Sequence, residues 1–250
     1  MTPLASRIIG SGHEVAFVHG FTQTRDSWLP LLHHLRTDIR ATLIDAPNHG
    51  ESTDSLTLTE TGVALRELCV NKTVVGYSMG ARMTLVSAVQ SPHAYNRLVL
   101  ISGTAGLDTE EERAQRQESD AALATRIELI GVEAFIEEWL SNPMFAGLSR
   151  ENARVNDRLT NTAEGLSTSL RLCGTGQQET LWNQLHKVQI PVLLISGEKD
   201  QKFCALAERM HSLLPHSELH IHSGVGHTVH LEDSAGCAAV IDNWLESTQS

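Results

Sequence analysis

The sequence has few of the features that mark membrane, secreted or nucleic-acid-binding proteins. No apolar run reaches the roughly 18 residues that a membrane-spanning helix needs. The N-terminal stretch MTPLASRIIGSGHEV lacks the charged start and long apolar core of a secretion signal. No cluster of lysines and arginines offsets a formal net charge of -11 at pH 7, which disfavours phosphate backbones and anionic lipids as partners. We therefore expect a cytoplasmic protein that binds neither nucleic acid nor membranes.

Cysteine is also scarce. Cys69, Cys173, Cys204 and Cys237 are widely spaced single residues. This spacing fits neither a zinc ribbon nor the dense disulfide framework of a small secreted domain. We expect reduced and mostly buried thiols.

The chain reads as one domain over residues 1–250, because 41% of its residues are hydrophobic and no linker or change of composition divides it. Short β-branched or apolar runs end at Val18, Ile44, Gly76, Ile101 and Ser196, and a weaker run covers residues 218–222. Helices are expected over residues 59–69, 81–90, 205–214 and 234–245. This alternation predicts an α/β fold with a mostly parallel, doubly wound sheet covered on both faces.

The alternation of strands and helices stops between about residues 104 and 180. Charged, helix-prone sequence such as EEERAQRQESDAALATRIELI takes its place. The segment is too long for an ordinary connection. It predicts a helical cap insertion over the carboxyl ends of the strands, where doubly wound sheets bind their ligands.

The most informative motif is G-x-S-x-G in TVVGYSMGARMTL, formed by Gly76, Ser78 and Gly80. It follows an apolar strand and precedes a helix. A sharp strand-to-helix turn needs small residues on both sides of the serine and exposes its hydroxyl. We interpret Ser78 as the catalytic serine.

A serine hydroxyl is weakly reactive at neutral pH and needs an imidazole, itself oriented by an acid. In this kind of fold the acid follows a late strand and the histidine follows the last one. VLLISGEKD places Asp200 after a strand, with Glu198 as the alternative acid, and the Gly-rich loop after residue 222 carries His227. The predicted triad is Ser78, Asp200 and His227.

Three other histidines, His220, His222 and His230, lie near His227. His220 and His222 would share one face of a strand, but no Glu-x-x-His or cysteine partner completes a zinc site. We expect ordinary strand or surface histidines and no metal.

The stretch HGF, from His19 to Phe21, follows the first core strand. Its loop should supply an oxyanion donor, the backbone N–H of Phe21, beside the N–H of Met79. The loop DAPNHGES, with His49, reaches the same edge of the sheet and receives no chemical role.

Arg82 lies one helical turn after Ser78, where a cation is mildly unfavourable unless an anion binds nearby. It could instead pair with a structural carboxylate or reach solvent. By composition alone, Arg116 and Arg158 would be solvated helix charges and Trp139 part of the cap core.

Taken together, these stretches resemble the 2-succinyl-6-hydroxy-2,4-cyclohexadiene-1-carboxylate synthases of menaquinone biosynthesis, a family with the α/β-hydrolase fold. The resemblance runs through HGFTQTRDSW, GYSMGAR, TEEERAQRQESD, EEWLSNPMF, SGEKDQKF and GHTVHLE. It implies a cofactor-independent lyase whose triad removes a proton from a small anionic substrate, after which pyruvate leaves.

The resemblance assigns the triad to Ser78, Asp200 and His227. It also assigns carboxylate binding to Arg82, Arg116 and Arg158, and pocket positions to Tyr77 and Trp139. The sequence departs from the family in having NHG at Asn48, and in a slightly long spacing from the acid to the histidine. Two alternatives stay open: a carboxylic-ester or carbon-carbon bond hydrolase, and a non-catalytic ligand receptor. The sequence does not indicate the oligomeric state.

Overall fold

The computed structural model describes residues 3–248 and has a single seven-stranded sheet in that range. Its strands are β1 (Ser6–Gly10), β2 (His13–Val18), β3 (Ile39–Ile44), β4 (Thr73–Tyr77), β5 (Arg97–Ile101), β6 (Val192–Gly197) and β7 (Ser217–His222). Their order across the sheet is β1-β3-β2-β4-β5-β6-β7, and every pair is parallel except β1 with β3. The predicted mostly parallel sheet is therefore confirmed.

The edge strand β1 was not predicted. It has two apolar residues, Ile8 and Ile9, and both are exposed. An edge strand outside the core lacks the buried apolar run from which the other strands were identified.

Helices connect the strands and cover the sheet. They are α1 (Leu29–His34), α2 (Leu58–Cys69), α3 (Met79–Gln90), α4 (Glu110–Leu140), α5 (Val155–Arg158), α6 (Ala163–Cys173), α7 (Gln201–Leu213), α8 (Val229–Glu232) and α9 (Ser234–Ser247). Short 3-10 turns cover Arg25–Trp28, Pro143–Phe145, Thr175–Gln177 and Trp182–Lys187.

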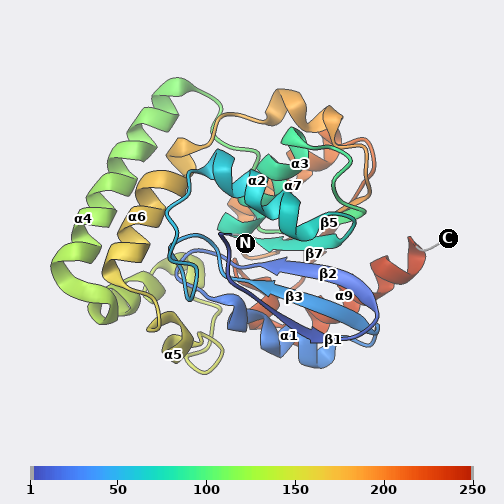
Figure 1. Cartoon of the computed structure of the whole chain (residues 1–250), viewed down its shortest axis with the longest axis horizontal. Helices are drawn as coiled ribbons and strands as arrows, with labels where there is room; N and C mark the ends of the chain where they lie inside the picture. Colours follow the sequence, from blue (N-terminus) through green and yellow to red (C-terminus); the bar gives the residue numbers. More distant parts are fainter. Residues whose placement is uncertain (1–2, 249–250) are drawn as a thin grey trace.

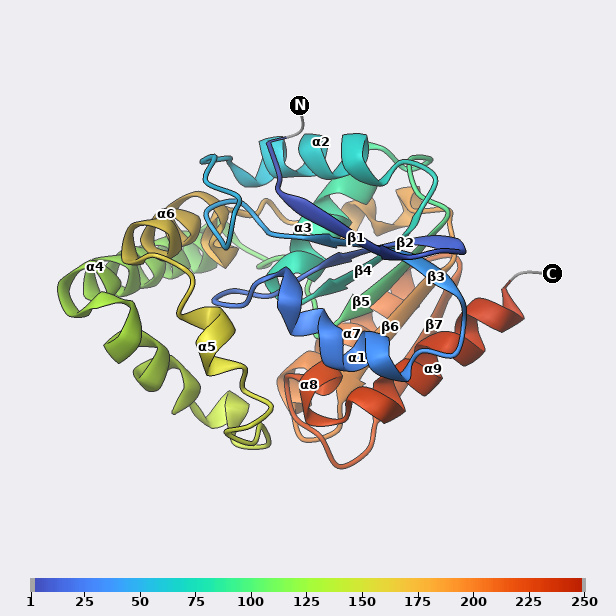
Figure 2. The ribbon, with the colours of Figure 1, turned by 60° about the horizontal axis from the view of Figure 1, so that its bottom comes forward.

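Two hydrophobic layers lie on opposite faces of the sheet. On one face, Leu65 of α2, Met83 of α3 and Met210 of α7 share a buried cluster with alternate strand residues. On the other, Leu31 of α1 and Ile241 of α9 pack against the remaining strand residues. Figure 2 shows α2 on one side of the sheet and α1 with α9 on the other. Such two-sided cover requires strands that are apolar on both faces.

The segment from α4 to α6, here called the cap, has a third cluster of its own that includes Phe135 and Leu166. Figure 1 shows α4, α5 and α6 together beside the sheet, and the arrow of β2 points toward them. A capping box of Thr109 and Glu112 starts α4. The helix is kinked at Gly131, whose φ of 79° and ψ of 170° are not helical.

All four cysteines are free; three are buried, as expected, and Cys204 is partly exposed. Among residues 3–248, every helix is too short or too polar to span a bilayer.

Candidate active site

Ser78 occupies the turn between β4 and α3. Its φ of 51° and ψ of -108° are unusual for a residue other than glycine. The turn requires the neighbouring glycines, because a Cβ on Gly80 would lie 2.1 Å from the carbonyl oxygen of Val18. The G-x-S-x-G segment therefore forms the strained strand-to-helix turn that its sequence predicts.

The structure brings Ser78, His227 and Asp200 into one hydrogen-bonded chain. His227 Nε2 lies 3.1 Å from Ser78 Oγ, and His227 Nδ1 lies 2.6 Å from Asp200 Oδ2. The alternative acid, Glu198, is exposed and accepts hydrogen bonds from Ser223 and Gly224 instead. The 27-residue spacing from acid to histidine leaves the contact intact. This geometry allows His227 to accept a proton from Ser78 while Asp200 fixes the imidazole tautomer.

The backbone around His227 is held by groups that the sequence did not reveal. The carboxylate of Glu232 accepts hydrogen bonds from the N–H of Gly226 at 2.7 Å and the N–H of Thr228 at 3.0 Å. Ser102 Oγ donates to the carbonyl of His227 at 2.8 Å. These contacts fix the backbone of the loop on both sides of the imidazole.

The other histidines have structural contacts. His220 and His222 share a face of β7, as predicted, with ring nitrogens 3.3 Å apart, and His222 Nε2 lies 2.9 Å from Asp233. His230 is buried against Trp28 and Tyr77, and burial lowers its pKa well below the usual value. Within residues 3–248 no group of three or more possible ligands is placed to hold a metal ion.

Phe21 lies in a turn closed by a 3.1 Å hydrogen bond from the N–H of Gln23 to the carbonyl of Gly20. In the part of the chain that the structure describes, no acceptor is found for the N–H groups of Phe21 and Met79. A Cβ on Gly20 would lie 2.6 Å from the Tyr77 ring and 3.5 Å from Ser78 Cβ. The turn thus lies close against the serine, as an oxyanion loop must.

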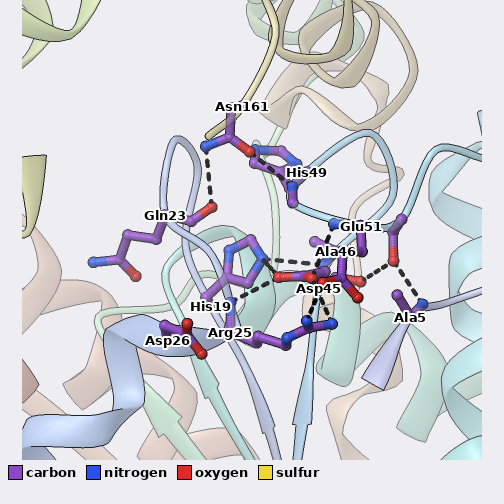
Figure 3. Close-up of polar contacts among 12 residues, drawn as sticks. Ala5, His19, Gln23, Arg25, Asp26, Asp45, Ala46, His49, Glu51 and Asn161 are labelled. Carbon is purple, nitrogen blue, oxygen red and sulfur yellow. Dashed lines mark hydrogen bonds and ion pairs between the residues drawn. The ribbon is translucent and has the colours of Figure 1, made fainter. Parts of the chain in front are cut away.

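Two buried histidines, His19 and His49, link the segment around this turn to the loop after β3; Figure 3 shows His19 beside Ala46 of that loop. His19 Nε2 accepts the N–H of Ala46 at 3.0 Å, and His49 Nε2 accepts the N–H of Thr22 at 3.4 Å. Burial is the main cause that lowers the pKa of His19 to about 4 and of His49 to about 3. Both rings are therefore neutral at physiological pH and act as hydrogen-bond acceptors.

Ion pairs also stabilise the loop after β3 (Figure 3). Buried Asp45 accepts the N–H of Arg25 at 2.8 Å, and the Arg25 guanidinium lies 3.1 Å from Asp45 and 2.6 Å from Glu51. The DAPNHGES loop, which received no chemical role from its sequence, thus supports the turn that carries Phe21.

A cavity of about 510 Å³ separates the core from the cap. Its lining includes Ser78 and His227 from the core and three arginines, Arg82, Arg116 and Arg158. A cavity that joins a serine–histidine pair to several guanidinium groups is suited to a small anionic ligand.

Arg82 and Arg158 are buried, and within residues 3–248 neither guanidinium forms an ion pair with a carboxylate. Arg82 donates to the Gln178 side chain at 3.2 Å and to the carbonyl of Cys173 at 2.8 Å. Arg158, only 1% exposed, donates to the carbonyl of Ala153 at 2.7 Å and to the hydroxyl of Thr22. Burial lowers the pKa of each guanidinium to about 10, so both stay charged at neutral pH. Composition suggested that Arg158 is solvated, and that interpretation is wrong because its side chain is buried where the cap meets Thr22 of the core.

Arg116 is more exposed than these two. Its Nε lies 2.8 Å from Asp120, and 41% of its side chain is accessible. Asp120 is buried, and its second carboxylate oxygen has no hydrogen-bond partner in the part of the chain that the structure describes. The structure therefore places the cation of Arg116 in the cavity wall with a carboxylate beside it.

Tyr77 and Trp139 also line the cavity. The hydroxyl of Tyr77 lies 3.2 Å from Thr228 Oγ1, and burial raises its pKa well above the usual value. The indole of Trp139 packs at 5.3 Å from the Phe21 ring, and its buried Nε1 has no acceptor among residues 3–248.

Comparison with known proteins agrees with this geometry. The model of the alpha/beta hydrolase family matches residues 15–240. A protein of Bacillus subtilis (strain 168), provisionally named 2-succinyl-6-hydroxy-2,4-cyclohexadiene-1-carboxylate synthase, is 36% identical over 93% of this chain and 90% of its own. The synthase of that name from Photorhabdus laumondii is 30% identical over 92% of this chain and 84% of its own.

A solved structure titled as MenH from S. aureus superimposes with a TM-score of 0.93, at 28% identity and with all of both chains covered. The chain therefore belongs to the alpha/beta hydrolase family and, within it, to the 2-succinyl-6-hydroxy-2,4-cyclohexadiene-1-carboxylate synthases.

Proposed function

We propose that this enzyme is a lyase of menaquinone biosynthesis. It eliminates pyruvate from 2-succinyl-5-enolpyruvyl-6-hydroxy-3-cyclohexene-1-carboxylate and forms 2-succinyl-6-hydroxy-2,4-cyclohexadiene-1-carboxylate. The observation that carries the proposal is the pair of buried arginines, Arg82 and Arg158, which line the cavity that holds Ser78 and, among the described residues, form no ion pair with a carboxylate. A buried cation without a counter-ion is costly unless a ligand supplies the negative charge.

The triad acts as a base in this reaction. His227 accepts the proton of Ser78, and the serine oxygen removes the proton from ring carbon 2, next to the succinyl carbonyl. The electrons of that C–H bond form the double bond at carbon 2, the existing double bond moves to carbon 4, and the C5–O bond breaks. The departing enolpyruvate gains a proton and becomes pyruvate, and His227 gives up the proton that it took from Ser78, so the reaction balances and the triad returns to its starting state.

Charge develops on the succinyl carbonyl oxygen when the proton leaves. The backbone N–H groups of Phe21 and Met79 are placed at the serine and are the donors for this oxygen. Because the charge forms in the transition state, the two donors lower the barrier more than they strengthen substrate binding.

The substrate carboxylates bind to Arg82, Arg116 and Arg158, since a guanidinium can donate two parallel hydrogen bonds to a carboxylate. Tyr77 and Trp139 complete the wall of the site. The proposal includes a single domain over residues 1–250 with its cap at about 104–180, a reaction without metal or organic cofactor, and action in the cytoplasm.

A direct assay of pyruvate release from the enolpyruvyl substrate tests the function. We expect one pyruvate for each diene formed, at an unchanged rate in the presence of EDTA. Turnover of simple esters without any pyruvate release would favour the ester hydrolase instead. Ligand binding without turnover would favour a receptor.

A further inference from the structure

Thr22, the residue after Phe21, has an unusual backbone conformation. Its φ is 67°, and its side chain is fully buried. A β-branched residue at positive φ is strained, and such strain persists only where the surroundings impose it. Thr22 is also the third residue of the turn from Gly20 to Gln23, a position where positive φ usually requires glycine. Something outside the turn must therefore hold it.

Each polar group of Thr22 has a partner from another segment. Its N–H points to His49 Nε2 at 3.4 Å, its hydroxyl accepts from Arg158, and its carbonyl accepts from Asn161 Nδ2 at 2.8 Å. Two of these three partners belong to the cap. The shape of a turn in the core therefore depends on cap residues.

Asn161, between α5 and α6, uses its whole amide in this role and is only 4% exposed. Besides Thr22, its Nδ2 donates to the carbonyl of Arg158 at 3.0 Å, while its Oδ1 accepts the N–H of Gly50 at 2.9 Å. Figure 3 shows Asn161 between the turn that carries Gln23 and the loop that carries His49. The carbonyls of Thr22 and Arg158 need donors and the N–H of Gly50 needs an acceptor, and a planar amide supplies all three.

We infer that Asn161 is a positioning residue for the oxyanion hole. It holds Thr22 at positive φ and so fixes the turn that presents the Phe21 N–H, which makes the oxyanion hole depend on the docked cap. The inference rests on the proposed function in taking this N–H as a donor in the reaction. Because Arg158 contacts both Thr22 and Asn161, a substrate carboxylate bound there would also stabilise the turn.

The test compares Asn161→Ala with Asn156→Ala, a control at an exposed asparagine of α5. We expect the kcat for pyruvate release to fall about 10- to 100-fold in Asn161→Ala, with KM changed by less than about threefold, because an oxyanion donor acts mainly in the transition state. Asn156→Ala should keep wild-type values. Unchanged kcat, or a loss confined to KM, would overturn the inference.

Amide hydrogen exchange provides a readout that needs no substrate. The Thr22 and Gln23 amides, which are hydrogen-bonded to His49 and to the carbonyl of Gly20, should exchange faster in Asn161→Ala than in wild type or Asn156→Ala, because the turn opens more often. If wild type releases no pyruvate, the proposed function fails, and equal exchange rates would then still reject the positioning role. If Asn161→Ala does not fold, Asn161→Asp replaces it, since it keeps the acceptor for Gly50 and loses the donor to Thr22.

Discussion

At the scale of single residues, local sequence identified the side chains whose position depends on local structure. Ser78 could be found because its turn needs glycines at fixed offsets, and Asp200 and His227 because they follow strands. The burial of Arg158 could not be found, because its helix is surrounded by charged residues and only the folded cap encloses it. Asn161 was missed for a related reason: its contact with Thr22 spans 139 positions and involves only backbone atoms of the partner.

The arginines give the sharpest prediction at this scale. Replacing Arg82, Arg116 or Arg158 by alanine should lower kcat/KM for pyruvate release by on the order of ten- to a thousandfold, because charge-assisted bonds are lost where water replaces them poorly. Replacement by lysine should restore only part of kcat/KM, since lysine keeps the charge but cannot donate two parallel hydrogen bonds to a carboxylate.

The matched control is Arg66→Ala, at an exposed arginine on α2. It should leave both the kinetics and the melting curve near wild type. Wild-type kinetics in all three cavity variants would remove the carboxylate-binding role.

At the scale of elements, clear apolar runs predicted β2 to β6, because strands buried on both faces have continuous apolar sequence. The edge strand β7 was predicted only from a weaker run, since most of its residues are not buried. The kink in α4 was not predicted. The stretch IELIGVEAF contains one glycine, and a glycine inside a helical pattern usually marks no break. The kink matters because Phe135 and Trp139, beyond Gly131, pack against Phe21.

Gly131 should therefore resist substitution, although the space around it is open, with the nearest atom 3.9 Å from an added Cβ. Gly131→Ala is expected to lower the free energy of unfolding by about 1–3 kcal/mol, because its backbone conformation is nearly exclusive to glycine. In a regular helix the same change would stabilise by about 1 kcal/mol.

The control, Ala122→Gly, lies on an exposed face earlier in α4 and should destabilise by about 1 kcal/mol. Urea unfolding of both variants measures the two changes in free energy of unfolding, and we expect both to be destabilising. A stabilised Gly131→Ala protein would show that the kink is not imposed by the fold.

At the scale of the whole molecule, the composition shows an acidic chain that is 41% hydrophobic, but not how the polar residues are distributed in the fold. Thirteen histidines are visible in the sequence, and only the structure shows that His19, His49 and His230 are buried. Their burial follows from two loops and α8 closing on one another, which no local pattern encodes.

These histidines predict how stability depends on pH. The folded protein lowers the pKa of His19 to about 4 and of His49 to about 3, so below pH 6.5 the unfolded chain binds more protons than the native state. The free energy of unfolding should therefore keep its full value above about pH 6.5 and fall as the pH drops toward 4. At pH 5 the loss is on the order of 2 kcal/mol for each buried histidine.

Urea unfolding at pH 5 and pH 7.5 measures how far the free energy of unfolding falls between the two pH values. His49→Gln should make this fall smaller, whereas His33→Gln, at an exposed position of α1, should not change it. Equal stability at the two pH values in the wild type would contradict neutral, buried histidines.

The central claim is that Ser78 works as a base in a lyase rather than as a nucleophile in a hydrolase. Single-turnover pyruvate release, followed in parallel with the intact mass of the protein, tests it most directly. We expect wild type to release pyruvate with no covalent adduct at any time, and folded Ser78→Ala to be slower by at least about a hundredfold. A mass increase that appears and decays with turnover, or near-normal pyruvate release by Ser78→Ala, would contradict this account.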